Sequence, residues 1–206
     1  MGRPRKFQER DVVALAGEAF SSNGYGGTTM DDLVRATGIG KQSLYNAFEG
    51  KRELFLRALT SDAADAVAAV DEALGSDETT PLERIRAHLL KLAITFSAGR
   101  SKAALLTKAT VELGDRDADV AQSALQTFQE LRAIYRGCLA DAQASGELAE
   151  SADPDGLASF FLALTRGMEV IGQAGISRAE LTSIAMTALD NLVAANDPSP
   201  SPPDAT

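Results

Sequence analysis

The sequence is poor in residue types on which several protein classes depend. Among its 206 residues there is no Trp, one Cys and one His, with 8 Phe and 3 Tyr. A single Cys excludes a disulfide framework and a cysteine-based zinc site. The scarcity of aromatic residues disfavours a β-sandwich or a β-barrel. No run of about 18 uncharged apolar residues is present, so we expect no contact with a membrane.

Signals for targeting and for catalysis are also missing. The first ten residues, MGRPRKFQER, are charged and lack the apolar stretch of a secretory signal, so we expect a cytoplasmic protein. The chain shows no nucleophile–base pair, no glycine loop that would hold a phosphate and no HExxH-type spacing. We therefore expect no catalytic residues, no metal and no cofactor, and predict that the protein is not an enzyme.

The abundant residues favour an all-α fold. Hydrophobic residues make up 45% of the chain, Ala and Leu are frequent, and apolar residues recur with the period of helices. Capping residues, Gly and Pro mark the breaks between periodic segments. The pattern predicts about nine helices, at residues 7–22, 30–36, 41–47, 51–74, 81–97, 101–113, 118–145, 154–171 and 178–195. The Pro/Ser-rich residues 196–206 are expected to form a disordered tail.

Charge is distributed unevenly along the chain. The net charge is −9, yet residues 1–58 carry nine Lys/Arg and seven Asp/Glu, a net charge of +2. Residues 59–206 carry eleven Lys/Arg and twenty-two Asp/Glu, a net charge of −11. A basic segment on an acidic remainder suggests that the basic segment meets a polyanion. A solvated basic tail is the alternative.

Residues 28–48 have the spacing of a helix-turn-helix. Thr28 and Thr29 each precede an Asp by three residues, which approximates a capping box, and Gly38 permits a positive φ at the turn. Five apolar residues can lock the two helices together: Leu33, Val34, Ile39, Leu44 and Phe48. The face left exposed on the second helix carries Lys41, Gln42, Ser43, Tyr45 and Asn46. Gln and Asn can pair with adenine and Lys with guanine, although a merely solvated face is the alternative.

The run GYGGTTMDDLVRATGIGKQSLYNAFEGKRELFLRAL resembles the N-terminal domain of the tetracycline-repressor (TetR) family of bacterial transcriptional regulators. The likeness is close over about residues 7–58 and elsewhere extends only to length and helix content. It implies a transcriptional regulator, most simply a repressor, that binds a double-stranded DNA operator. It also implies release by a small-molecule inducer of unknown identity that favours the state with weaker DNA binding.

The resemblance assigns roles to individual residues. Thr28 and Thr29 would lie at the N-terminus of the second helix, where Thr29 would contact a phosphate. Lys41, Gln42 and Ser43 would face base edges. Tyr45 and Asn46 resemble a Tyr-His pair that grips phosphates, and Lys51 would open the fourth helix at another phosphate. Arg3, Arg5 and Lys6 resemble a basic arm that enters the minor groove. Gly40 stands where relatives often have a Ser cap, so the helix that begins at Lys41 should lose roughly a few tenths of a kcal/mol of stability from capping.

The predicted function requires a dimer, because one helix-turn-helix reads only a few base pairs. The last predicted helix has two apolar faces, which fits either deep burial or a second subunit. We predict a homodimer that uses Leu181, Ile184, Ala185, Ala188 and Leu192. The domains are then residues 1–50 for DNA binding and residues 51–195 for ligand binding and dimerisation, with the helix from residue 51 linking them.

The inducer pocket is predicted from polar residues among apolar neighbours: His88, Thr95, Thr107, Thr110, Gln129, Tyr135 and Arg166. A hydrogen-bonded core histidine is the simpler interpretation of His88, and Arg166 with Glu169 is most simply a surface ion pair. Cys138 is interpreted as a small buried hydrophobe rather than a redox sensor. An alternative for the whole chain is a helical protein-binding adaptor with a vestigial helix-turn-helix.

Overall fold

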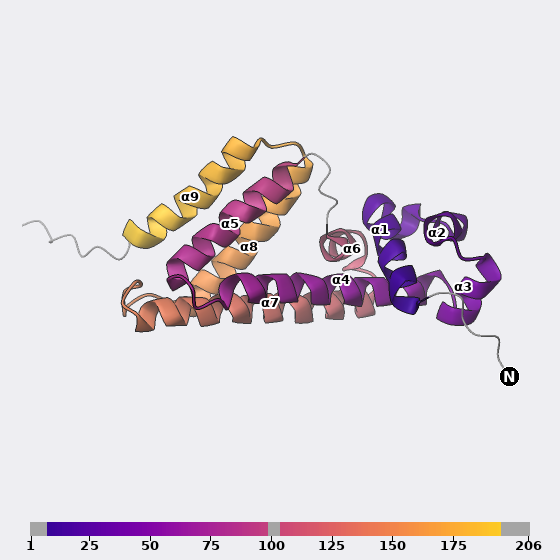
Figure 1. Cartoon of the computed structure of the whole chain (residues 1–206), viewed down its shortest axis with the longest axis horizontal. Helices are drawn as coiled ribbons and strands as arrows, with labels where there is room; N and C mark the ends of the chain where they lie inside the picture. Colours follow the sequence, from indigo (N-terminus) through magenta and orange to yellow (C-terminus); the bar gives the residue numbers. More distant parts are fainter. Residues whose placement is uncertain (1–7, 99–103, 195–206) are drawn as a thin grey trace, which may run out of the picture. The chain divides into compact units, whose positions relative to one another are not determined.

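The computed structural model describes residues 8–98 and 104–194. All regular structure in these ranges is helical, as the sequence predicts. The helices are α1 (Glu9–Gly27), α2 (Met30–Thr37), α3 (Lys41–Phe48), α4 (Lys51–Leu74), α5 (Pro81–Ser97), α6 (Leu105–Leu113), α7 (Ala118–Ala144), α8 (Pro154–Gln173) and α9 (Arg178–Ala194) (Figure 1). None of these described helices is long and apolar enough to cross a membrane. The predicted tail lies outside the described residues.

The first helix departs from its predicted end at Ser22. Gly24 has a φ of 77° and a ψ of 171°, which breaks the helix where the sequence predicts a stop. The chain then adds a further turn that ends at Gly27. The prediction was wrong about this last turn because its backbone groups are bound by side chains that lie far away in the sequence.

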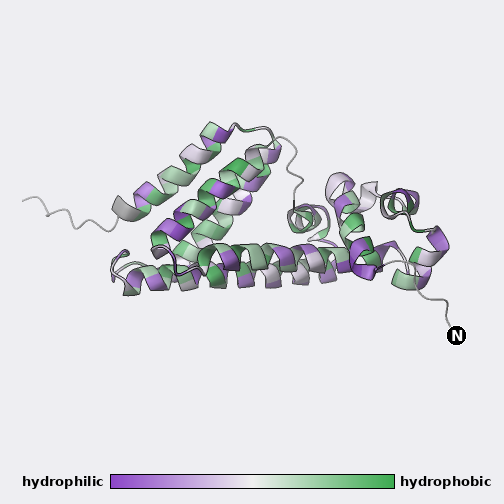
Figure 2. Ribbon diagram, in the orientation of Figure 1, coloured by the Kyte–Doolittle hydropathy of each residue, from purple (hydrophilic) through white to green (hydrophobic). Residues whose placement is uncertain are grey.

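The described residues form two compact units. The first contains residues 8–69 and 104–131, and the second contains residues 70–98 and 132–194, so that α4 and α7 contribute to both. The predicted boundary at residue 50 divides the chain by function and stays a prediction. Figure 2 shows hydrophobic and hydrophilic residues alternating around most helices, which is the amphipathic pattern of helices that bury one face.

The first unit is built around an apolar core. α1 contributes Val12, Ala16 and Phe20, which recur every four residues and are each at most 2% exposed. Leu33, Leu44 and Phe48 join them from α2 and α3, as the sequence predicts, and Val34 and Ile39 are partly buried against them. Phe20 and Phe55 meet edge to face, with ring centroids 5.1 Å apart. This packing fixes α2 and α3 against α1 and leaves the outer face of α3 in solvent.

In the second unit α5 packs against both α8 and α9. α8 begins as predicted at Asp153, whose carboxylate accepts a hydrogen bond from the backbone N–H of Asp155 at 3.1 Å. Pro154 occupies the first helical position, where a missing N–H costs nothing. The apolar sides of α5, α8 and α9 bury, among others, Leu89, Phe161 and Leu181.

Candidate nucleic-acid interface

The turn between α2 and α3 is built from local capping interactions. Thr29 caps α2: its hydroxyl accepts from the N–H of Asp32 at 3.1 Å, and the Asp32 carboxylate accepts from the N–H of Thr29 at 2.8 Å. Hydrogen bonds from the Thr29 side chain and backbone lower the pKa of Asp32. Gly38 then ends α2 with a φ of 69°, as predicted, and Gly40 starts α3 without a side-chain cap.

The outer face of α3 carries the residues that the sequence predicts would face bases and phosphates. Lys41, Gln42, Ser43, Tyr45 and Asn46 are all exposed, and Tyr45 is 44% exposed despite its aromatic ring. The Gln42 side-chain amide donates to the Asn46 side-chain oxygen at 3.0 Å. This contact is exposed, so either side chain can exchange it for a base edge at little cost.

Two other predicted DNA contacts are placed elsewhere. Thr28 is fully buried and its hydroxyl donates to the backbone oxygen of Gly24 at 2.6 Å. The Lys51 ammonium donates to the backbone oxygens of Tyr25 at 2.9 Å and Thr28 at 3.0 Å, and it lies 4.1 Å from the centroid of the Tyr25 ring. Both side chains therefore hold the segment that leads into α2, and the structure does not bring them to the outer face of α3.

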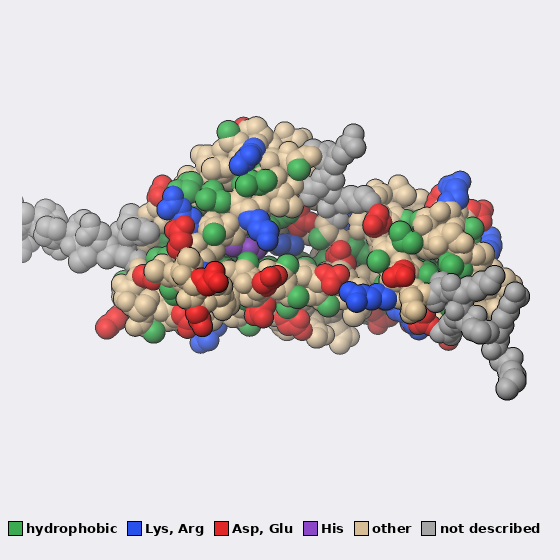
Figure 3. All heavy atoms as spheres, in the orientation of Figure 1, with side chains coloured by type: hydrophobic (Ala, Val, Ile, Leu, Met, Phe, Trp, Pro, Cys, Tyr) green, Lys and Arg blue, Asp and Glu red, His purple; other side chains and the backbone are tan. Residues whose placement is uncertain are grey.

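The charge around α2 and α3 is mixed. Arg35 pairs with Asp32, and the Lys41 ammonium lies 3.5 Å from the Asp31 carboxylate. Figure 3 accordingly shows basic and acidic side chains interspersed near these helices on the face drawn. Residues 8–58 carry six Lys/Arg and seven Asp/Glu, so the net positive charge of residues 1–58 comes from Arg3, Arg5 and Lys6. That predicted arm lies outside the described residues.

Three of the predicted ligand residues come together in the second unit. The rings of His88 and Tyr135 are 5.9 Å apart between centroids, and both residues are buried. His88 Nε2, the Tyr135 hydroxyl and Arg166 Nε have no hydrogen-bond partner of ordinary geometry in the described part of the chain. Buried polar atoms without partners are uncommon in folded proteins, so this cluster is a candidate ligand subsite.

The ion pair of Arg166 and Glu169 is not at the surface, contrary to the sequence interpretation. Arg166 Nη1 lies 2.9 Å from Glu169 Oε2, and the Glu169 side chain is 3% exposed. The helical spacing brings the two residues into contact as predicted, but the sequence does not indicate which side of α8 faces the core. Glu169 is therefore a buried charge beside the cluster that sequence reasoning missed.

The other predicted ligand residues lie away from this cluster. The Thr95 hydroxyl is exposed and donates to the backbone oxygen of Lys91 at 2.9 Å. Thr107, Thr110 and Gln129 belong to the first unit, where Thr110 donates to the backbone oxygen of Leu106 at 2.7 Å. Cys138 is buried, as predicted, and burial raises the pKa of its thiol to about 11.

The burial of His88 should make the free energy of unfolding depend on pH. Desolvation lowers the pKa of His88 from 6.5 to about 4, so the folded protein keeps the imidazole neutral while the unfolded chain binds a proton below pH 6.5. The stabilising contribution is present above pH 6.5 and is lost as the pH falls toward 4. Wild type should lose about 2–3 kcal/mol more than His88→Gln between about pH 7.5 and pH 4.5, measured by urea unfolding. Equal losses in the two proteins would contradict a desolvated imidazole.

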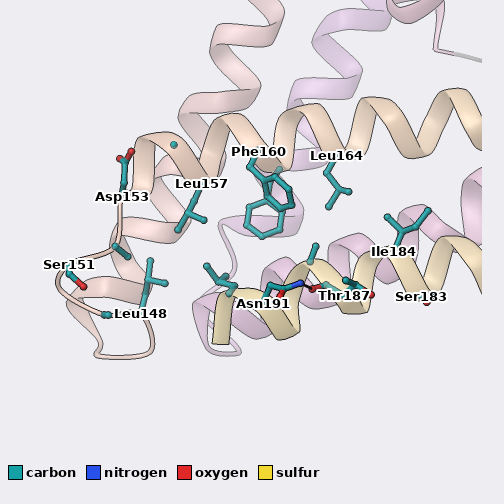
Figure 4. A pocket seen from close by; sticks show the side chains of 16 residues that line it. Leu148, Ser151, Asp153, Leu157, Phe160, Leu164, Ser183, Ile184, Thr187 and Asn191 are labelled. Carbon is teal, nitrogen blue, oxygen red and sulfur yellow. Dashed lines mark hydrogen bonds between the residues drawn. The ribbon is translucent and has the colours of Figure 1, made fainter. Parts of the chain in front are cut away.

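An open apolar groove of about 890 Å³ lies between α8 and α9 (Figure 4). Leu157, Phe160 and Leu164 of α8 line one side, and Phe160 is 47% exposed. Of the five residues predicted for the dimer interface, Ile184, Ala188 and Leu192 line the groove. Leu181 and Ala185 are fully buried within the chain, because they lie on the inward face of α9.

The described residues form only helices, and the second helix of the helix-turn-helix exposes Gln, Ser, Tyr and Asn. This arrangement is that of the helix-turn-helix DNA-binding proteins. The family model described as bacterial regulatory proteins of the tetR family matches residues 12–58. The model described as the tetracyclin repressor-like C-terminal domain matches residues 81–186. This chain belongs to the TetR family of transcriptional regulators.

Individual relatives support this assignment. The chain is 33% identical over 164 residues to the uncharacterized HTH-type transcriptional regulator YezE of Bacillus subtilis, covering 78% of this chain and 83% of YezE. It is 28% identical over 190 residues to the HTH-type transcriptional repressor ComR of Escherichia coli, covering 91% and 90% of the two chains. A cysteine mutant of the TetR family regulator CifR, solved with a 26-base-pair operator DNA, has a TM-score of 0.80 and 25% identity, covering 93% of this chain and 100% of that one.

Proposed function

We propose that this regulator is a repressor that binds a palindromic operator as a homodimer and is released by a small molecule. The observation that carries the proposal is the outer face of α3, where five neighbouring polar side chains stand on a helix that is locked to α2 through Leu44 and Phe48. Repression is favoured as the sign of regulation because ComR is named a repressor. Binding to chromosomal DNA would place the protein in the cytoplasm.

Within the interface we propose a division between base and phosphate contacts. Lys41, Gln42 and Ser43 lie in the first turn of α3, the part of a recognition helix that meets base edges. Tyr45 and Asn46 lie further along and would bind phosphates, as would Thr29 at the start of α2. Thr28 and Lys51 would act indirectly, because their side chains hold the backbone between α1 and α2.

The groove between α8 and α9 is the proposed dimer interface. A Phe side chain that is 47% exposed inside an apolar groove favours coverage by an equivalent surface of a second copy. A two-fold dimer presents two recognition helices about 34 Å apart, one turn of DNA, or a multiple of that distance. The operator would accordingly be a palindrome.

The inducer would bind at the cluster of His88, Tyr135 and Arg166. Its unpaired polar atoms can bond to a ligand that reaches them, and the surrounding apolar residues would bury the remainder of that ligand. Release from the operator requires that the inducer bind more tightly to the state with weaker DNA affinity. DNA must then weaken inducer binding by the same factor.

Two substitutions on α3 distinguish contacts to bases from contacts to phosphates. Gln42→Ala should lose roughly tenfold affinity for the preferred operator and relax the preference at one base pair, because a bidentate contact to a base is lost. Tyr45→Phe should weaken binding to all duplexes alike, because only a phosphate contact is lost. Titrations of each variant with the operator and with its single-base variants measure both effects. A uniform loss for Gln42→Ala would contradict its role in reading bases.

Selection of bound duplexes from a random pool tests the proposed function as a whole. A repressor of this kind should enrich a two-fold symmetric sequence and bind it with a steep dependence on salt. Recovery of no common sequence would instead favour the protein-binding adaptor. Thermal-shift screening of small molecules would then identify inducers, because a ligand of the folded state raises the melting temperature.

A further inference from the structure

The break in α1 is bound from outside by two charged residues of α6. In an unbroken α-helix the N–H groups of Tyr25 and Gly26 would bond to the carbonyl oxygens of Ser21 and Ser22. Here the Lys108 ammonium donates to the oxygen of Ser21 at 2.9 Å and to that of Ser22 at 2.8 Å. The break at Gly24 thus separates two carbonyl oxygens from two amide groups. Lys108 of α6 binds the two carbonyl oxygens, and Glu112 of the same helix binds the two amides.

The Glu112 carboxylate occupies both of the remaining positions. Its Oε2 accepts from the N–H of Tyr25 at 2.8 Å, and its Oε1 accepts from the N–H of Gly26 at 2.6 Å. Glycine makes room for this carboxylate: a Cβ on Gly24 would lie 2.6 Å from Oε2, and one on Gly26 would lie 3.0 Å from Oε1. The sequence Gly-Tyr-Gly thus has a physical reason in a contact with a helix more than eighty residues away.

The arrangement is specific in charge and in register. A cation suits the carbonyls that end the first part of α1, and an anion suits the free amides that follow the break. Lys108 and Glu112 are four residues apart and so lie on one face of α6. A shift of α6 by one turn, about 5.4 Å, would remove both charges from their partners and would place one of them opposite backbone groups of the wrong polarity.

The N-terminal end of α6 is also fixed, by a contact with α4. The Asp62 carboxylate of α4 accepts from the N–H of Leu106 at 3.1 Å, and Leu105, Leu106 and Ala109 are buried in the core of the first unit. Just beyond the bound amides, Lys51 and Thr28 bind the same segment before α2 begins at Met30. The contacts from α6 therefore act directly on the backbone of the α1–α2 junction, which determines the orientation of α2 and α3.

We propose that Lys108 and Glu112 are positioning residues that hold the helix-turn-helix in its DNA-binding orientation through the end of α1. The proposal rests on the proposed function, since the orientation matters only for a protein that binds an operator. The two residues touch no DNA in this scheme. Their effect on affinity comes from fixing the α1–α2 junction, which a change in the position of α6 would release.

Glu112→Gln tests the proposal with two independent measurements. The operator Kd, measured by fluorescence anisotropy on the selected duplex, should rise about tenfold, because charge-assisted hydrogen bonds to two amides are weakened. Exchange of the Tyr25 and Gly26 amide hydrogens, measured by NMR without DNA, should accelerate at least about tenfold. Asp115→Asn is the matched control, since its side chain is 74% exposed and forms an ion pair with its neighbour Arg116, and it should change neither quantity.

Lys108→Met provides a second variant should Glu112→Gln fold poorly, and it should likewise raise the operator Kd. Lys108→Arg should keep the operator affinity near that of wild type because it retains a charged donor. A lower melting temperature for Glu112→Gln with an operator Kd within about twofold of wild type would overturn the proposal, since the residue would then stabilise the fold without positioning the interface. Failure of wild type to select any duplex would instead refute the proposed function. The amide exchange would in that case decide by itself whether Glu112 holds the junction.

Discussion

Replacement of Phe160 by Glu should convert the protein to a monomer and weaken operator binding at least about a hundredfold, because a monomer engages only one half-site. Phe160 is 47% exposed in the single chain and stands in the α8–α9 groove with Leu157 and Leu164. A carboxylate there stays hydrated in a monomer, so the fold should survive. In a dimer the carboxylate would be buried without a partner, which would destabilise the dimer by roughly several kcal/mol.

Sedimentation equilibrium and operator titration measure the two parts of this prediction. Leu125→Glu is the control, because Leu125 is an exposed apolar residue of the first unit (59%) that does not line the groove. It should remain dimeric with an unchanged Kd. A Phe160→Glu protein that stays dimeric and binds its operator normally would show that the copies associate through another surface.

Neutralising the basic arm should give the second large effect. The triple variant Arg3→Ala, Arg5→Ala, Lys6→Ala should bind operator about 30- to 100-fold more weakly at about 0.15 M salt. These three residues supply the net positive charge of residues 1–58, since residues 8–58 carry one more acid than base. Several described cations are already paired, as Arg52 is with Asp119 at 2.6 Å.

The salt dependence distinguishes a contacting arm from a solvated one. The slope of log K against log salt should fall by about 2–3, because each phosphate contact contributes about 0.9. A matched control removes three exposed cations of the second unit, Arg86, Arg132 and Arg178, and should leave the slope unchanged. Equal effects of the two triple variants would mean that the arm contributes only through the net charge of the protein.

The elements that the sequence predicts are those specified by neighbours in the chain. The Thr29–Asp32 capping box, the positive φ of Gly38 and the start of α8 at Asp153 each depend on residues at most three positions apart. The outward face of α3 follows from the spacing of Leu44 and Phe48, which leaves the polar positions of the helix in solvent. Local chemistry and helical periodicity are therefore sufficient for the helix boundaries named here and for the exposed face of α3.

The contacts missed from the sequence are those between residues far apart in the chain. Lys108 and Glu112 are spaced like an ordinary exposed ion pair of a helix, and nothing near them indicates α1 as their partner. The sequence likewise gives Leu181 and Ile184 the same apolar face of α9, whereas the structure buries Leu181 fully and lets Ile184 line the groove. The three-dimensional packing of α9 on α5 decides between them.

The burial of the Cys138 thiol makes it practical to measure the distance between recognition helices with thiol-directed labels. It is the only cysteine in the chain, it is buried, and a thiol whose pKa is raised to about 11 is scarcely ionised near neutrality. Labelling requires the thiolate to attack the electrophilic maleimide or thiol-reactive nitroxide reagent, so Cys138 should stay largely unlabelled in the folded protein. A cysteine introduced on the outer surface of α3 could then be labelled selectively without first removing the native one, and spin–spin distances between two labelled copies would report the separation of the recognition helices.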